Sequence, residues 1–186
     1  MIKKLSLLSI LTTFLVVNCG VAIPRTTVLE PKDSAQEHQL DACGIKITIP
    51  AKWKLEAEPS VPPVLHAVKD KIDIVIDVIT EKDVEKVSTK MIEKIKTTLN
   101  KEIVGGRVAK NTTPNKIEVT TIYTMSADKK DSADVDVILC PSGAGSLVLY
   151  TYSPIATYNT DRAAVLAITN SAKSTKEEAA APAKKK

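Results

Sequence analysis

The chain of 186 residues carries 26 Lys and Arg against 22 Asp and Glu, a net charge of +4, and only 3% of its residues are aromatic. This near balance of charge argues against a nucleic-acid-binding protein, which needs basic residues gathered on one face. The scarcity of aromatic rings also argues against recognition of sugars or single strands, because much of that binding comes from stacking on such rings.

The first 18 residues have the composition of a bacterial export signal. Lys3 and Lys4 precede an apolar core of about 13 residues that runs from Leu5 to Val17. This core is shorter than the roughly 20 residues that a membrane-spanning helix needs, and no later stretch is apolar and long enough to span. We therefore expect residues 1–18 to be a signal peptide that the mature chain has lost.

A cysteine follows this segment in a sequence that resembles a bacterial lipobox. Residues 15–20 are Leu-Val-Val-Asn-Cys-Gly, and the departure is Asn18, where most lipoboxes carry Gly, Ala or Ser. The resemblance implies that Cys19 is acylated and anchors the mature chain to a membrane. The alternative is a plain secretory cleavage after Ala22, which fits the small-x-small rule and discards Cys19.

The number of cysteines favours the lipid anchor. In an oxidising compartment three cysteines leave one thiol unpaired, whereas acylation of Cys19 leaves Cys43 and Cys140 as an even pair. Cys43 precedes the first expected strand and Cys140 ends a late one, so both can lie near one edge of a sheet. We favour a disulfide between them over two buried thiols.

Two terminal segments differ in composition from the rest of the chain. Residues 19–39 mix prolines, charges and small residues without a period, and we expect a flexible tether behind the lipidated N-terminus. Residues 175–186 are rich in Ala and Lys, and we expect a disordered tail. The folded part is therefore expected to be one domain over residues 40–174.

Apolar periodicity predicts the elements of this domain. Strands are predicted at 44–49, 64–68 and 72–79, where apolar and polar residues alternate. The period then becomes helical and predicts a helix over 83–103, with a capping box of Thr80 and Asp83 at its start and Gly105-Gly106 as its stop. The remaining predictions are strands at 108–110, 117–125, 135–140 and 147–153, and a helix over 161–173 that buries Val165, Ile168 and Ala172.

The order of these elements predicts the fold class. Short connections between strands indicate antiparallel pairing. The predicted fold is therefore α+β, with helices packed on one large antiparallel sheet.

Two segments resemble the PsbP/Mog-like superfamily. The first runs from Gly44 through an apolar strand into Pro50-Ala-Lys-Trp53, and the second is the strand and helix over residues 147–173. The resemblance implies an α/β/α sandwich with about six to seven strands and a non-enzymatic binding or adaptor role. It carries over no binding residue: Gly44, Pro50 and Trp53 match the family motif, and Trp53 is expected in the core.

The residue types that carry chemistry are not arranged as a catalytic, cofactor or metal site. His38 and His66, the two histidines, have no ligand partners at metal-binding spacing. Two carboxylate pairs alternate along predicted strands, and we expect them to form a polar, solvent-facing side: Asp73 with Asp77, and Asp134 with Asp136. We therefore expect no cofactor and no enzymatic activity.

The sequence favours a lipoprotein of the bacterial cell envelope, at the outer membrane, that binds an envelope or host protein. A secreted or periplasmic soluble protein is the alternative location. Two alternative functions are a periplasmic carrier of an apolar or lipid ligand, with a cavity between helix 83–103 and the sheet, and a surface-exposed host-binding adhesin. Lys184, Lys185 and Lys186 are either a solvated tail or a contact with anionic lipid or peptidoglycan.

Overall fold

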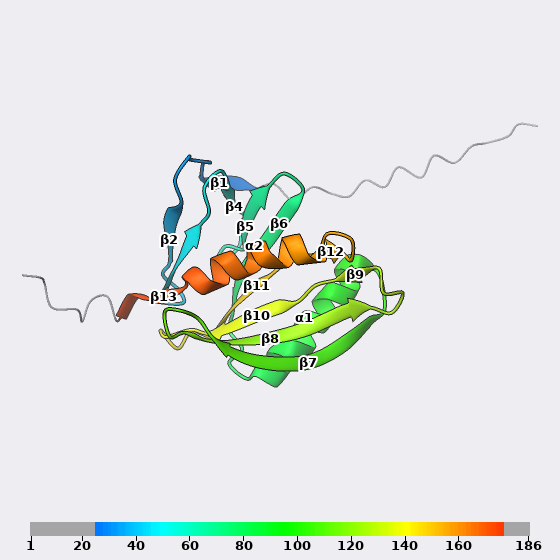
Figure 1. Cartoon of the computed structure of the whole chain (residues 1–186). Coiled ribbons are helices and arrows are strands. Elements are labelled where there is room, and N and C mark those ends of the chain that lie inside the picture. Colours follow the sequence, from blue (N-terminus) through cyan, green and yellow to red (C-terminus); the bar gives the residue numbers. More distant parts are fainter. Residues whose placement is uncertain (1–24, 177–186) are drawn as a thin grey trace, which may run out of the picture.

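The computed structural model describes residues 25–176, which form three layers (Figure 1). A large antiparallel sheet is the middle layer, helix α1 (Val84–Leu99) covers one face, and helix α2 (Tyr158–Ser171) with a small sheet covers the other. Neither of these helices is long and apolar enough to cross a membrane. The predicted signal peptide, Cys19 and the three terminal lysines lie outside the described residues.

The large sheet has ten strands, in the order β1-β4-β5-β6-β11-β10-β8-β9-β12, and β7 pairs with the other side of β8. The small sheet has the order β13-β3-β2. The strands of the large sheet are β1 (Thr26–Leu29), β4 (Lys54–Ala57), β5 (Leu65–Lys69), β6 (Ile72–Ile79), β7 (Ile103–Thr112), β8 (Glu118–Ser126), β9 (Asp131–Ser132), β10 (Val135–Leu139), β11 (Ser146–Tyr150) and β12 (Ser153–Pro154). Those of the small sheet are β2 (Gln36–Leu40), β3 (Ile45–Ile49) and β13 (Lys173–Ser174).

The predicted α+β fold with one large antiparallel sheet is confirmed, but the expected number of six to seven strands is wrong. Short pairings such as β9 with β12 add strands to the large sheet, and β1 joins it from the N-terminal segment. Strands of two to four residues are too short to show the apolar alternation that identifies a strand in a sequence.

Both faces of the large sheet are apolar, and each helix covers one of them. On β6, Ile74 and Ile76 belong to the core under α2 and the small sheet, whereas Val75 belongs to the core under α1. Helix α1 buries Val87, Met91 and Ile95, and α2 buries the predicted residues Val165 and Ile168. Because successive strand residues point to opposite faces, the two cores share one sheet without mixing.

Helix α1 ends four residues earlier than predicted. Asn100 adopts the left-handed conformation, with φ 50°, and its backbone N–H donates to the carbonyl of Thr97. Ile103, which fits the helical period, is instead the first residue of β7. At the other end the N-cap is Asp83 itself, whose carboxylate accepts from the backbone N–H groups of Glu85 and Lys86, so the predicted capping box with Thr80 is wrong.

The N-terminal segment is not a flexible tether over its described part. Thr26 lies opposite Ala57 in the β1–β4 ladder, and β2 pairs with β3 along its whole length. Only Leu29 of β1 packs against the core and its other side chains are exposed, so its position depends mainly on backbone pairing and on ion pairs of Arg25. An exposed strand has no apolar periodicity, which is why the sequence suggested a tether.

The predicted disulfide joins Cys43 and Cys140, whose Cα atoms are 4.7 Å apart. It connects the loop before β3 to the end of β10 and so ties the small sheet to the large one. Gly44 follows with φ +73°, a conformation that favours glycine. Because the bridge closes a loop of 97 residues, it stabilises the fold by about 4–5 kcal/mol on the chain-entropy model. Trp53 is buried, as the family motif implies.

Candidate functional site

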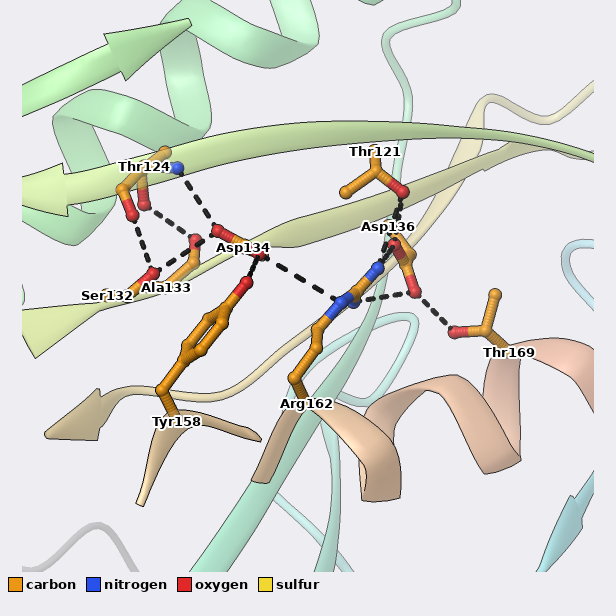
Figure 2. Close-up of polar contacts among 9 residues, drawn as sticks. All are labelled: Thr121, Thr124, Ser132, Ala133, Asp134, Asp136, Tyr158, Arg162 and Thr169. Carbon is orange, nitrogen blue, oxygen red and sulfur yellow. Dashed lines mark hydrogen bonds and ion pairs between the residues drawn. The ribbon is translucent and has the colours of Figure 1, made fainter. Parts of the chain in front are cut away.

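Two carboxylates that were expected to face solvent are buried under α2. Asp136 has an exposed fraction of 0%, and the guanidinium of Arg162 contacts both its oxygens, with Nη2 2.6 Å from Oδ1 and Nη1 3.0 Å from Oδ2 (Figure 2). Alternation correctly places Asp134 and Asp136 on one face of the sheet, but α2 covers that face. The expectation of a solvent-facing pair is therefore wrong.

Asp136 is fully satisfied by hydrogen bonds. The hydroxyl groups of Thr121 on β8 and Thr169 on α2 each donate to its carboxylate at 2.8 Å, on either side of the Arg162 guanidinium (Figure 2). Burial by itself lowers the pKa of Arg162, but the hydrogen bonds and charge of Asp136 more than offset this and raise that pKa above its ordinary value. Arg162 therefore remains a cation although it is largely buried.

Asp134 holds the first residue of α2. The hydroxyl of Tyr158 donates to Asp134 Oδ2, and the backbone N–H of Thr124 and the hydroxyl of Ser132 donate to Oδ1 (Figure 2). Burial and this hydrogen bond raise the pKa of Tyr158 to about 12. Together with the pair of Asp136 and Arg162, these contacts fix the first turns of α2 against β8 and β10.

An apolar groove of about 430 Å³ opens beside the fixed start of α2. One wall comes from β7 and β8, where Val104 lies opposite Met125 and Arg107 lies opposite Tyr123. The other wall comes from the segment between β12 and α2, which contributes Ile155. The groove is further lined by Gly105, Thr124, Ser132, Asp134 and Tyr158.

The groove combines exposed apolar side chains with one cation. Val104, Met125 and Ile155 are all exposed, and the guanidinium of Arg107 lies 5.7 Å from the centroid of the Tyr123 ring. Apolar side chains gathered around a concave surface mark a binding site more often than scattered ones do. We therefore take this groove as the candidate functional site.

A β-bulge in the edge strand shapes the groove. The register between β7 and β8 shifts between Gly105 and Arg107, and Gly106 has φ +107°. A Cβ atom at Gly105 would lie 2.6 Å from the carbonyl oxygen of Tyr123, so any side chain there would push the two strands apart. The two glycines that were expected to stop a helix instead place Val104 and Arg107 on the same face.

The groove could not be predicted from the sequence, because its residues come from three separated segments. The available indication was the pair Gly105-Gly106, which between Val104 and Arg107 also fits a bulge in a strand. The predicted helix end at residue 103 excluded that interpretation.

A second, charged pocket surrounds His66, which was expected to be an ordinary strand residue. His66 is buried, and its ring nitrogens lie 2.8 Å from Glu58 Oε1 and 2.7 Å from Asp73 Oδ1. Arg25 Nη1 lies 2.9 Å from the other oxygen of Asp73. Burial by itself raises the pKa of Asp73, but the hydrogen bond to His66 and the charges of His66 and Arg25 lower it below its ordinary value.

This second pocket has a volume of about 460 Å³ and extends to Lys94 and Thr98 of α1, so it lies partly between that helix and the sheet. Charged side chains line it from both elements, unlike the apolar cavity that a lipid carrier needs. Both ring nitrogens of His66 are engaged by carboxylates. Within residues 25–176 no group of three or more His, Cys, Asp or Glu side chains is placed to hold a metal ion.

Comparisons with known proteins establish the fold. No family model matches the chain, and no curated protein matches it in sequence. The solution structure of cyanobacterial PsbP (CyanoP) from Synechocystis sp. PCC 6803 resembles this structure with a TM-score of 0.56 at 9% sequence identity, covering 76% of this chain and 93% of that one. The chain therefore has a PsbP-like fold, as the two motifs implied.

The buried ion pair predicts a large loss of stability when only one partner is removed. In Arg162→Ala the carboxylate of Asp136 stays buried without its cation, so we expect the free energy of unfolding to fall by about 3–5 kcal/mol. Urea denaturation measures this change. The control is Lys110→Ala, which removes an exposed ion pair with Glu118 and should cost about 0–1 kcal/mol. Equal losses in the two variants would contradict the burial of Asp136.

The raised pKa of Tyr158 predicts a loss of stability at alkaline pH. Its pKa is about 10 in the unfolded chain and about 12 in the folded protein, so the unfolded state releases its proton first. The contribution is complete below pH 10 and is lost as the pH rises from about 10 to about 12. Urea denaturation across this range should show a shallower decline for Tyr158→Phe than for the parent protein; parallel declines would contradict the prediction.

Proposed function

We propose that this protein is a lipoprotein of the bacterial cell envelope, anchored at Cys19 to the outer membrane, that acts as a non-enzymatic protein-binding or adaptor module. The apolar groove between β7, β8 and the start of α2 is the observation that carries the binding role. The lipobox-like residues 15–20 and the preceding apolar core support the anchor.

The chemistry of the groove fits a protein partner. Binding energy at protein interfaces concentrates where a large apolar side chain enters a pocket that neighbouring contacts keep dry. The groove is bordered by three exposed apolar side chains, those of Val104, Met125 and Ile155. Arg107 adds a cation beside them. The proposed occupant is an exposed apolar side chain of the partner, with a carboxylate nearby that pairs with Arg107.

Hydrogen bonds hold the side of the groove that α2 provides. Tyr158 lines the groove and is fixed by Asp134, while Arg162 in the next turn of α2 is fixed by Asp136. A surface whose side chains are already held in place loses less entropy when a partner binds. This supports recognition of a defined partner surface.

The volume of the groove gives an apolar ligand some support as the second candidate. At about 430 Å³ it falls in the range of roughly 300–1,000 Å³ that small-molecule sites occupy. Such sites bury most of their ligand, however, whereas this groove is bordered by exposed side chains. A protein partner fits better, because its own surface would cover these exposed side chains. If the anchor displays the domain on the cell surface, that partner is a host protein and the module is an adhesin.

The terminal lysines enter the proposal as an additional envelope contact. Lys184, Lys185 and Lys186 would meet anionic lipid or peptidoglycan, and each lysine near an anionic membrane contributes about 1 kcal/mol. The last described residue, Lys176, lies beside the disulfide corner, where its amine donates to the carbonyl of Pro141 at 2.9 Å.

Crosslinking from the groove tests the binding role. A photoreactive amino acid at position 104 should give a discrete crosslinked protein in intact cells, because this position lines the groove. The matched control is position 108, a valine on the same strand with similar exposure (46% against 53%) that lies opposite the core residue Ile122, on the other sheet face. Gel shifts and mass spectrometry identify the products. The same product from both positions would contradict a role for the groove.

Intact mass of the protein, released from envelopes by muramidase and detergent, tests the anchor. The expected species begins at Cys19 and carries acyl groups, and reduction of the Cys43–Cys140 bridge adds two hydrogens. Additional muropeptide mass would identify the terminal lysine as a wall attachment. An unmodified chain that begins at Ile23 would refute the lipoprotein proposal.

A further inference from the structure

The chain enters the large sheet at a defined corner. Thr26 lies opposite Ala57, so β1 begins where β4 ends. Arg25, the residue before β1, forms ion pairs with two carboxylates of the large sheet and its loop. Its Nη1 lies 2.9 Å from Asp73 and its Nε lies 4.0 Å from Glu58. Glu58 is the residue at which the chain leaves β4 for the loop to β5, residues 58–64. The entry of the chain and this loop therefore lie side by side.

A short length of chain separates this corner from the proposed anchor. Six residue steps join Cys19 to Arg25, and even a fully extended chain spans at most about 3.6 Å per residue, which gives about 22 Å. This limit holds for any conformation of residues 19–24. A chain anchored at Cys19 therefore keeps this corner within about 22 Å of the membrane surface.

The loop at this corner exposes an apolar tip. Val61 is fully exposed and stands among Pro59, Pro62 and Pro63. The only ionisable side chain in residues 58–64 is that of Glu58, and its carboxylate contacts His66 of the sheet rather than the tip. Val28 of β1 is a second exposed apolar side chain on the same edge of the sheet.

The conformation of this loop is held by internal hydrogen bonds. The backbone N–H of Glu58 donates to the carbonyl of Val64 at 2.8 Å, and the hydroxyl of Ser60 donates to the carbonyl of Pro62 and accepts from the N–H of Val64, each at 2.9 Å. The hydrogen bonds hold the loop in a conformation that leaves the side chain of Val61 in water. Transfer of this apolar side chain from water to an apolar environment is favourable.

We propose that this corner, defined by Arg25, Thr26 and the 58–64 loop, rests on the lipid bilayer with Val61 in the membrane interface. The inference rests on the proposed anchoring at Cys19 and specifies which surface of the domain the anchor turns toward the lipid.

The proposal also places the groove relative to the membrane. Strand β7 lies seven positions from β1 in the strand order, and at about 4.8 Å per position the groove stands about 34 Å from the anchored edge. The groove thus lies near the edge of the sheet farthest from the proposed membrane contact.

Tryptophan fluorescence on vesicles tests this orientation. The mature chain from Cys19 is coupled through that thiol to a maleimide-bearing phospholipid, because Cys43 and Cys140 are bonded and cannot react. Val61→Trp is compared with Val108→Trp, which places the same probe at the opposite edge of the sheet. Vesicles of phosphatidylethanolamine and phosphatidylglycerol with brominated acyl chains quench a tryptophan that enters the interface. Emission from the buried Trp53 is subtracted with the parent protein.

We expect the Val61→Trp emission to shift to shorter wavelength and to lose most of its intensity on brominated vesicles, with Val108→Trp unchanged. Quenching of Val108→Trp instead, or of neither variant, would overturn the inference. Because the lipid is attached chemically, this result does not depend on natural acylation of Cys19, which the intact mass tests separately. A loss of the orientation therefore cannot be confused with a loss of the anchor.

Discussion

The ion pair between Asp136 and Arg162 is the contact on which the arrangement of α2 depends. A carboxylate buried in an apolar layer costs several kcal/mol unless charge and hydrogen bonds compensate it. Compensation requires that Arg162 and Thr169 of α2 both reach Asp136, together with Thr121 of β8. Apolar contacts alone tolerate small shifts of a helix on a sheet, whereas this set of contacts fixes one position. Tyr158 is placed by that position, and with it one side of the groove.

The two edges of the large sheet are built differently. Strand β1 at one edge has almost no buried side chain and is held by backbone pairing and by the charges around Arg25. Strand β7 at the other edge is long, and its bulge at Gly105 turns Val104 and Arg107 toward the groove. In the proposed arrangement the first edge meets the lipid and the second meets a partner. A wide single sheet suits this division because it keeps the two surfaces far apart.

Likeness to cyanobacterial PsbP concerns architecture and not residues. At 9% identity the two chains share the arrangement of sheet and helices, and this likeness carries over no site residue. One fold supports many unrelated sites, so function has to be argued from the site. In this protein the site is an open apolar groove with one cation, a chemistry that fits the proposed protein interface.

The sequence by itself determined the α+β class, the central strands and the amphipathic helix α1, because periodicity is a local property. It favoured a bond between Cys43 and Cys140 over two buried thiols, and the structure contains that bond. Tertiary structure decided the rest. Alternation shows that Asp134 and Asp136 share a face but not that α2 covers it, and an exposed strand such as β1 leaves no apolar pattern to find. The position of Ile103 in the apolar pattern fits both a helix and a strand. In the structure it belongs to a strand because its backbone pairs with β8. The groove needs three distant segments to meet, which only packing brings about.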